Sequence, residues 1–216
     1  IDLANEQKGL VPTSEWKKKT HGIPWQPGEN LSIAIGQGYN LVTPLQMAVL
    51  TSAVANNGTV YKPNIMTSIN SVQGKTVKES SAEVAGKLPA GKETLEIIKK
   101  GLYDTVNNRH GTAYWHVRSE KAPISGKTGT AQVIGRRLDD MMESEIVHKH
   151  YLTHAWFTGY APSENPRISV SVILEHGGGG ASEAGPVAKE MMLTYLNLDK
   201  DNDPAKNAED REQANE

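Results

Sequence analysis

The chain has 216 residues, of which 37% are hydrophobic, and this is enough for one ordinary domain with its own core. Its formal net charge of −2 argues against a general nucleic-acid-binding surface, and the absence of cysteine excludes a disulfide framework and a thiolate metal site. The sequence has no run of about 20 apolar residues and no basic segment before an apolar stretch, so we expect neither a membrane span nor a signal peptide in it.

The first 40 residues are rich in Gly, Pro and Trp, and they predict irregular structure. Because Ile1 is not preceded by an initiator Met, we expect the chain to be a piece of a longer protein. Thr43-Pro44 predicts the start of a helix, with Thr as N-cap and Pro at the first helical position, and Asn57-Gly58 predicts its end. The β-branched residues from Val60 to Val77, with a turn at Gly74, predict a hairpin.

The second half of the chain predicts helices around a run of strands. A helix is expected from Glu93 to Asn107, with Leu95, Ile98 and Leu102 on one face. The predicted strands are Ile124–Ile134, Ala155–Tyr160 and Ile168–Glu175, and the last alternates apolar residues as a half-buried strand does. The charged segment 136–150 predicts a loop, and Gly177–Gly180 a flexible turn.

A closing helix is predicted from Pro186 to Leu196, with Val187, Met191 and Tyr195 facing inward. Successive strands joined by short turns and followed by a helix indicate an α/β fold in which an antiparallel sheet is covered by helices. Residues 199–216 differ from the rest, because they hold seven acidic and three basic residues and almost nothing apolar. We therefore expect a disordered acidic tail there.

The strand around Ser125–Gln132 carries the clearest chemistry. Lys127 supplies a fixed positive charge, and the hydroxyls of Thr128 and Thr130 are two residues apart, so they point to the same side of a strand. The small residues between them let another backbone lie alongside. Such a strand suits an extended peptide that ends in a carboxylate.

Lys127-Thr128-Gly129 resembles the third active-site motif of the penicillin-binding transpeptidases. Other stretches resemble the elongation-type members of that family, the penicillin-binding protein 2 family. These stretches are Gly9–Thr13, Trp16-Lys17, Trp25–Glu29, His154–Pro162 and Leu174–Gly178. Gly36–Tyr39 with Thr43–Ala48 resembles the helix segment that precedes the third motif in the family as a whole. The resemblance covers residues 1–198, nearly everything but the tail.

The resemblance implies that residues 1–198 are the C-terminal portion of a penicillin-binding transpeptidase or serine β-lactamase-like domain. The parent would be a D,D-transpeptidase that cross-links peptidoglycan stem peptides and is acylated by β-lactams. Lys127 would attract the substrate carboxylate and tune the protons near the nucleophile, and Thr128 and Thr130 would donate hydroxyls to that carboxylate. The Thr130 N–H would form half of the oxyanion hole, and Gly129 would leave room for the acyl group. No cofactor or metal is implied.

The implied partners are the peptidoglycan stem peptide, β-lactam antibiotics, the upstream half of the same domain and membrane proteins of cell elongation, but no nucleic acid. The implied location is the periplasmic side of the bacterial inner membrane, to which the parent would be anchored. The family also needs a Ser-x-x-Lys and a Ser-x-Asn, and the resemblance places both before Ile1. Two local matches, Ser14–Lys17 and Ser163–Asn165, occur at the wrong places in the order of motifs, so we interpret them as chance matches and expect the chain alone to be inactive.

Two other functions stay open from the residues: a serine β-lactamase-like hydrolase, and a non-catalytic module that binds without chemistry. We interpret three further groups of residues as structural rather than functional. Gly36-x-Gly38 lacks the third Gly of a dinucleotide loop and predicts a turn before a helix. His148, His150 and His154 predict a solvated loop rather than a metal site, and Trp115, Trp156 and Phe157 predict core or cleft wall.

Overall fold

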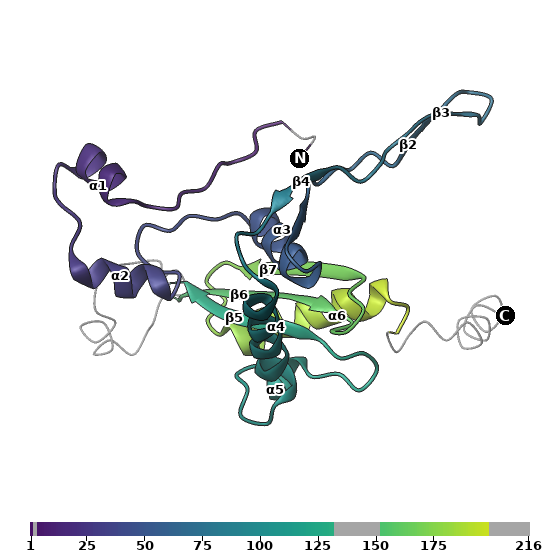
Figure 1. Ribbon diagram of the computed structural model, residues 1–216. Helices are drawn as coiled ribbons and strands as arrows, with labels where there is room; N and C mark the ends of the chain where they lie inside the picture. The colour runs from purple at the N-terminus through teal and green to yellow at the C-terminus, as the bar shows by residue number, and fades with distance from the viewer. Residues whose placement is uncertain (2–3, 132–151, 199–216) are drawn as a thin grey trace. The chain divides into compact units, whose positions relative to one another are not determined.

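The computed structural model describes residues 1, 4–131 and 152–198. The chain divides into two compact units, Ile1–Gly91 and Lys92–Glu216 (Figure 1). The predicted loop at 136–150, the predicted strand end after Ala131 and the predicted tail at 199–216 lie outside the described residues. No helix of the described part of the chain is long and apolar enough to cross a membrane.

The first unit begins with two short helices, α1 (Ser14–His21) and α2 (Pro27–Ala34). The prediction of irregular structure over the first 40 residues is therefore wrong. Both helices have two turns, too few to show a clear apolar period, and their signal lies in their caps. Thr13 Oγ1 accepts the Trp16 N–H at the start of α1, and Pro27 with the N3 residue Glu29 opens α2.

The third helix, α3 (Pro44–Ala55), confirms its predicted start. The Thr43 hydroxyl accepts the Gln46 N–H at 3.1 Å, while Gln46 Oε1 accepts the Thr43 N–H at 3.0 Å, so the two residues form a capping box. The helix ends where predicted, because Asn57 and Gly58 have positive φ angles of 55° and 91°.

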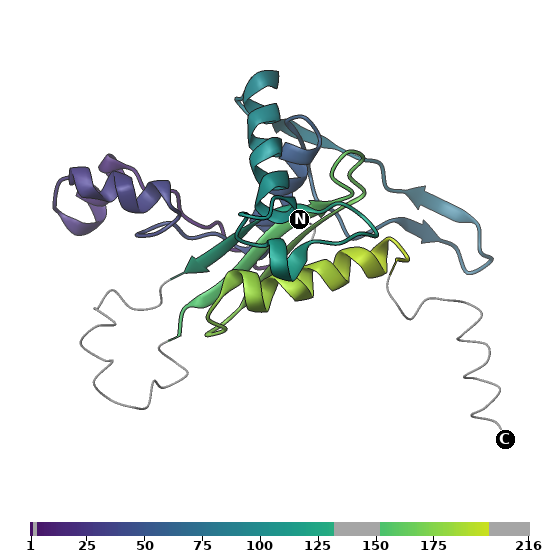
Figure 2. The ribbon, with the colours of Figure 1, turned by 90° about the horizontal axis from the view of Figure 1, so that it is seen from below.

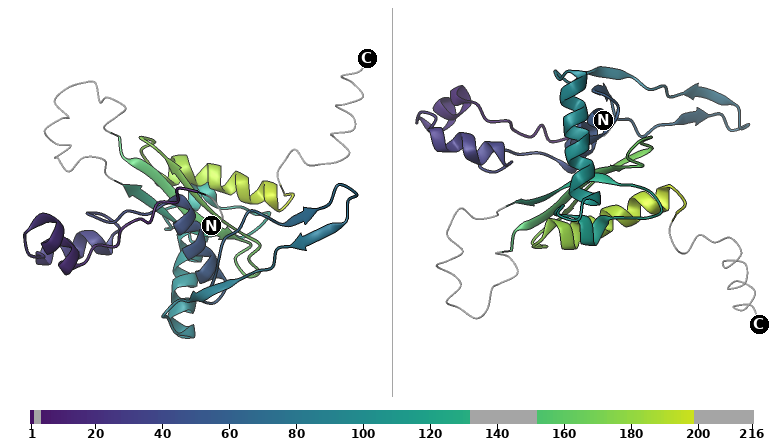
Figure 3. Two further views of the ribbon diagram at one scale, coloured as in Figure 1. Left: turned by 90° about the horizontal axis from the view of Figure 1, so that it is seen from above. Right: turned by 60° about the horizontal axis from the view of Figure 1, so that its bottom comes forward.

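Two antiparallel strand pairs follow. β2 (Ser68–Asn70) and β3 (Thr76–Glu79) form the predicted hairpin, which Figure 3 shows as a two-stranded ribbon, and Gly74 in its turn has a φ of 79°. β1 (Thr59–Tyr61) pairs instead with β4 (Val84–Lys87). The strand β4 was not predicted, since its four residues are all exposed and carry no apolar alternation.

The second unit is built on a three-stranded antiparallel sheet in the order β5-β6-β7, which confirms the predicted fold class. Its strands are β5 (Ser125–Ala131), β6 (His154–Ala161) and β7 (Ile168–Leu174). Two helices precede the sheet, α4 (Lys92–Asn107) and α5 (Tyr114–Val117). A π-helical turn (Gly180–Ala184) and α6 (Gly185–Tyr195) follow it, and Figure 2 shows α6 running along the sheet.

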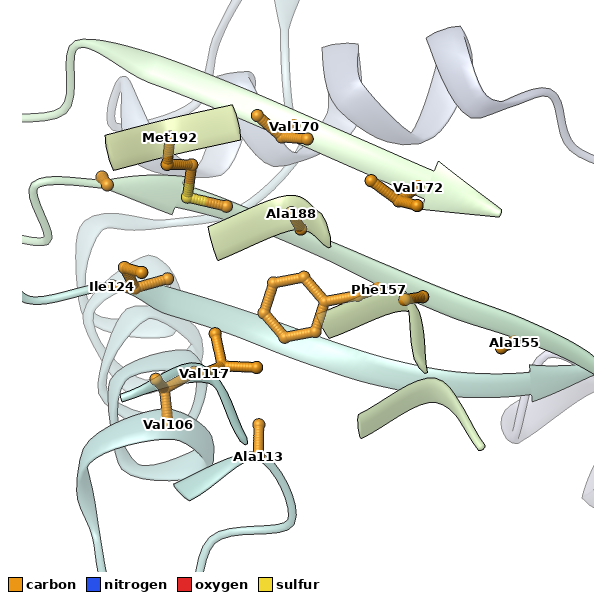
Figure 4. Packing of buried hydrophobic residues seen from close by; sticks show 12 residues of the cluster. Val106, Ala113, Val117, Ile124, Ala155, Phe157, Val170, Val172, Ala188 and Met192 are labelled. Carbon is orange, nitrogen blue, oxygen red and sulfur yellow. The ribbon is translucent and has the colours of Figure 1, made fainter. Parts of the chain in front are cut away.

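One face of this sheet, together with α4, α5 and α6, forms the core. Figure 4 shows the Phe157 ring in the middle of the cluster, with Met192 and Ala188 of α6 on one side and Val117 on the other. The other members are Val106, Ala113, Ile124, Ala155, Ala161, Val170, Val172 and Ala184. Val170 and Val172 are only 5% and 8% exposed, because α6 packs on them from within this chain.

The closing helix is confirmed, but its predicted inward face is wrong. Val187, Met191 and Tyr195 are 42%, 49% and 56% exposed, whereas Ala188 and Met192 are fully buried. Apolar residues lie on several sides of α6, so spacing alone could not choose between the faces. The small Ala side chains allow the closer approach to the sheet. In α4, Leu95 is buried and Ile98 is 41% exposed.

Candidate active site on strand β5

The predicted site residues lie on β5, which has no strand on its outer side among the residues that the structure describes. Lys127 is exposed, and its Nζ donates to the Thr128 backbone O at 2.7 Å and to Thr128 Oγ1 at 3.4 Å. The ammonium group is therefore held along the open edge of the strand. Since an ammonium group has three donors, it can also bind an incoming acceptor.

The alternation of β5 places the site residues on two faces. Thr128 and Thr130 lie across from Phe157 and Ala155, so both hydroxyls are on the face that carries the core. Lys127 lies across from Thr158, on the opposite face, and its Nζ reaches back over the edge to Thr128. The strand edge therefore combines the Lys127 ammonium with the Thr128 hydroxyl at 3.4 Å.

The backbone of β5 at Gly129 is supported by the π-helical turn. A Cβ placed on Gly180 would collide with the backbone O of Gly129 and with that of Trp156, and it would lie 3.0 Å from the Gly129 N. Only glycine allows this close approach. A Cβ on Gly129 itself would lie 3.0 Å from the Trp156 Cβ, so this position also favours glycine. The two glycines hold the middle of the strand in a fixed place.

A buried polar network holds the start of β5. Ser125 is fully buried, lies across from Tyr160 and donates from its Oγ to Ser163 Oγ at 2.8 Å. Burial raises the pKa of the Tyr160 phenol, and a hydrogen bond with Ser125 opposes this effect. The Ser163 N–H donates to the Pro123 O at 2.9 Å. Ser163-Glu164-Asn165 lies in the bend between β6 and β7.

Two histidines contact each other where β6 begins and β7 ends. His154 Nδ1 accepts the His176 N–H at 2.9 Å, and the two rings are 4.9 Å apart. The Gly178 N–H donates to the Thr153 O at 2.9 Å, so the glycine-rich turn is bonded to the residue before β6. Within the described part of the chain no three His, Cys, Asp or Glu side chains could hold a metal ion. His148 and His150 lie outside it.

The chance match to Ser-x-x-Lys, Ser14–Lys17, also has a structural explanation. Lys17 is 2% exposed, and its Nζ binds Glu29 Oε2 at 2.6 Å, which joins α1 to α2. The lysine is thus used in an ion pair. Gly36 and Gly38 both have a φ of 74° and follow α2, so they form a turn after a helix and precede α3, as predicted.

One contact of the site was not predicted. Thr112, in the loop between α4 and α5, places its Oγ1 3.1 Å from Thr128 Oγ1. The sequence offers no signal for it, because the two residues are 16 positions apart and belong to different elements. The aromatic prediction is confirmed for Phe157, which is core, but Trp115 is 73% exposed and is not part of the core.

The chain matches a known family model. The match, to the penicillin binding protein transpeptidase domain, spans residues 1–193. Among curated proteins, the chain is 36% identical to the peptidoglycan D,D-transpeptidase MrdA of Haemophilus influenzae, over 100% of this chain and 34% of that protein. The chain therefore spans about a third of the length of the curated relatives it matches.

Two solved structures give the same answer. Penicillin-binding protein 2 of Pseudomonas aeruginosa, in complex with WCK 5153, matches with a TM-score of 0.73 and 32% identity, over 93% of this chain and 41% of that one. The complex of penicillin-binding protein 2 with MreC from Helicobacter pylori matches with a TM-score of 0.69 and 31% identity, over 90% of this chain and 32% of that one. The chain belongs to the penicillin-binding protein transpeptidase domain family and represents part of such a domain.

Proposed function

We propose that this chain is the C-terminal part of a peptidoglycan D,D-transpeptidase whose upstream part supplies the nucleophilic serine. The observation that carries the proposal is the open edge of β5, where the Lys127 ammonium lies beside the Thr128 hydroxyl. The family match and the relatives named as D,D-transpeptidases support it. The chain spans only about a third of these relatives, so the rest of each relative leaves room for the other two motifs.

The proposed reaction is an acyl transfer. The serine Oγ attacks the carbonyl carbon of the D-Ala-D-Ala peptide bond, the C–N bond breaks, and D-Ala leaves with a proton on its nitrogen. An amine of a neighbouring stem peptide then attacks the ester, forms the cross-link and returns the proton to the serine. A β-lactam would acylate the same serine, but its opened ring stays attached. Neither step calls for a cofactor or a metal.

The residues of β5 would act on the charged parts of this reaction. Lys127 attracts the substrate carboxylate, and Thr128 and Thr130 donate hydroxyl hydrogen bonds to it. The Thr130 N–H, with the N–H of the nucleophilic serine, stabilises the negative oxygen of the tetrahedral intermediate. Gly129, which has no side chain, leaves room for the acyl group.

The upstream half of the domain would also be a structural partner. In the first unit, Val11, Leu31 and Ile35 are 76%, 75% and 76% exposed. Large exposed apolar groups are typical of surfaces that are covered in the complete protein. We therefore expect the chain alone to self-associate.

The other proposed partners follow from the reaction and from the relatives. The substrate is the peptidoglycan stem peptide, which places the site on the periplasmic side of the inner membrane. β-Lactams are the expected inhibitors. Membrane proteins of cell elongation are expected partners of the parent, since the Helicobacter pylori relative was solved in complex with MreC. A net charge of −2 gives no reason to include nucleic acid among the expected partners.

Labelling with a fluorescent penicillin tests the proposal. The complete transpeptidase should give a labelled band on a denaturing gel, whereas the chain alone should give none. Mixing the chain with the upstream half should restore labelling. Loss of a band from the chain alone on Ser14→Ala would show that Ser14 is a nucleophile after all. A complete protein that releases the label quickly would be a β-lactamase, and one that is never labelled would be a non-catalytic module.

A further inference from the structure

A hydroxyl from outside the Lys-Thr-Gly strand reaches the proposed carboxylate site. Thr112 Oγ1 lies 3.1 Å from Thr128 Oγ1, and either oxygen can be the donor. Thr112 is exposed, so the contact is not a consequence of burial. Two exposed hydroxyls gain little stability from one hydrogen bond in water, which directs attention to what the pair can do for a ligand.

The loop that carries Thr112 is held in place on both sides. Before it, the His110 N–H donates to Asn108 Oδ1 at 3.0 Å and the Gly111 N–H donates to the Asn108 O at 2.8 Å. A Cβ on Gly111 would collide with the Thr105 backbone O, so the loop packs directly on α4. After it, the fully buried Ala113 donates its N–H to the Thr105 O at 3.0 Å.

The same loop is fixed relative to β5. Asn107 Nδ2, at the end of α4, donates to the Ile124 O at 2.8 Å, immediately before β5 begins. Ala113 and Val117 pack in one cluster with Ile124 and Phe157. Backbone hydrogen bonds and core packing therefore set the distance between Thr112 and Thr128.

The donors and acceptors around Thr128 then give Thr112 a role. A hydroxyl has one proton to donate and two lone pairs to accept with. Lys127 Nζ can only donate, and it reaches Thr128 Oγ1 at 3.4 Å. If Thr112 also donates, both lone pairs of Thr128 are occupied and its single proton is left for a third group. If Thr128 donates to Thr112 instead, that proton is used and Thr128 cannot bind an anion.

We propose that Thr112 is a positioning residue for the carboxylate of the stem peptide or β-lactam, which acts by donating to Thr128 and turning the Thr128 proton toward the carboxylate. The inference rests on the proposed function, because it needs a carboxylate ligand at β5. A carboxylate accepts hydrogen bonds only, so its arrival selects the arrangement in which Thr112 is the donor.

The test compares two ligands that differ only in the carboxylate. The acylation rate of the complete transpeptidase is measured with benzylpenicillin and with its methyl ester, which lacks the negative charge. Thr112→Val keeps the shape and removes the hydroxyl. It should slow acylation by benzylpenicillin about 2- to 13-fold, the effect of one neutral hydrogen bond, and leave the rate with the ester nearly unchanged. Thr112→Ser should restore the rate with benzylpenicillin.

A second measurement separates positioning from a merely structural role. Because Thr112 acts through Thr128, adding Thr112→Val to Thr128→Val should cost no further rate, whereas independent effects would multiply. Equal slowing of both ligands, multiplied losses, or an unchanged rate in Thr112→Val would overturn the inference and leave the proposed function intact. A wild-type protein that no penicillin acylates would remove the proposed function, and the inference with it.

Discussion

The two units of the chain differ in how they are held together. The second unit has a continuous core, and all twelve buried members of its cluster come from residues after Lys92. The first unit buries little beyond Thr51, Ala53, Val54 and Ala55 of α3, and its two short helices are joined by the ion pair of Lys17 with Glu29. The sheet unit therefore has its own source of stability, whereas the first unit depends on caps and polar contacts.

This difference bears on function because the proposed site lies in the unit with the core. The atoms of an active site must be fixed within fractions of an ångström. β5 is fixed by its pairing with β6, where Thr128 lies across from Phe157, and by the close approach of Gly180 to Gly129. The exposed apolar side chains of the first unit, among them Leu31 and Ile35, fit a segment that is completed by other parts of the protein.

The comparison predicts its largest effect at Phe157. Phe157→Ala empties the middle of the core and should lower the free energy of unfolding by about 3–5 kcal/mol. The matched control is Leu31→Ala, which is 75% exposed and should change it by about 0.5 kcal/mol or less. Urea unfolding followed by circular dichroism measures both. Similar losses in the two variants would mean that the first unit has a core of its own.

Lys127→Ala should separate activity from stability. In the complete protein, loss of the ammonium should slow acylation by a β-lactam about 10- to 150-fold, the effect of one charge-assisted hydrogen bond. The melting temperature should change little, because Lys127 is exposed. Lys78→Ala, on the exposed strand β3, is the control and should leave acylation unchanged. Normal acylation of the Lys127 variant would remove this residue from the site.

The sheet was predictable from the sequence because alternation is a local signal. Ile168–Leu174 alternates, and its buried residues are the ones that the alternation indicates. The face of α6 was not predictable, since apolar residues surround that helix and only the sheet beneath it selects Ala188 and Met192. In the first unit, α1 and α2 were missed because two-turn helices depend on caps rather than on a period.

The candidate site was predictable only along one strand. The Lys-Thr-Gly motif identifies β5, because adjacent residues of a strand keep a fixed geometry. The contact of Thr112 with Thr128 joins a loop to a strand. The close approach of Gly180 to the Gly129 backbone joins residues that are 51 positions apart. Such contacts depend on how the elements pack, and a single sequence does not contain that information in any local pattern.

The corrected orientation of α6 predicts an intermediate effect. Ala188→Leu adds three carbons at a fully buried contact and should cost about 1–3 kcal/mol of stability through overpacking. Met191→Ala, on the exposed side of the same helix, should cost about 0.5 kcal/mol or less. Thermal unfolding of the two variants measures the difference. The reverse order would restore the inward face predicted from the sequence, with Met191 inside.

The first unit predicts a smaller, pH-dependent effect. The pKa of Glu29 lies below its ordinary value of 4.5, because its carboxylate accepts the Gln26 N–H and the Lys17 ammonium. A lowered pKa in the folded state means that the contact stabilises above pH 4.5 and is lost as the pH falls through the folded value. The Gln26 amide proton, followed by NMR, should shift in that range. Glu29→Gln should abolish the shift and Glu15→Gln should keep it.

The smallest effect is expected from residues 199–216, which resemble neither unit. With seven acidic and three basic residues and no large apolar side chain, this segment has nothing to bury, so its removal should cost no packing energy. A cut after Leu198 also keeps the hydrogen bond from Lys121 Nζ to the Leu198 O, which ties the end of the α6 segment to the rest of its unit.

The melting temperature of residues 1–198 should therefore equal that of the whole chain within about 1 °C, since a change of 1 kcal/mol would shift it by about 2–4 °C in a domain of this size. Removing the negative charges should leave penicillin labelling of the complete protein unchanged as well. A fall of many degrees on truncation would show that the segment binds to one of the two units, and the exposed side of α6, with Met191 and Tyr195, would be the first surface to examine for that contact.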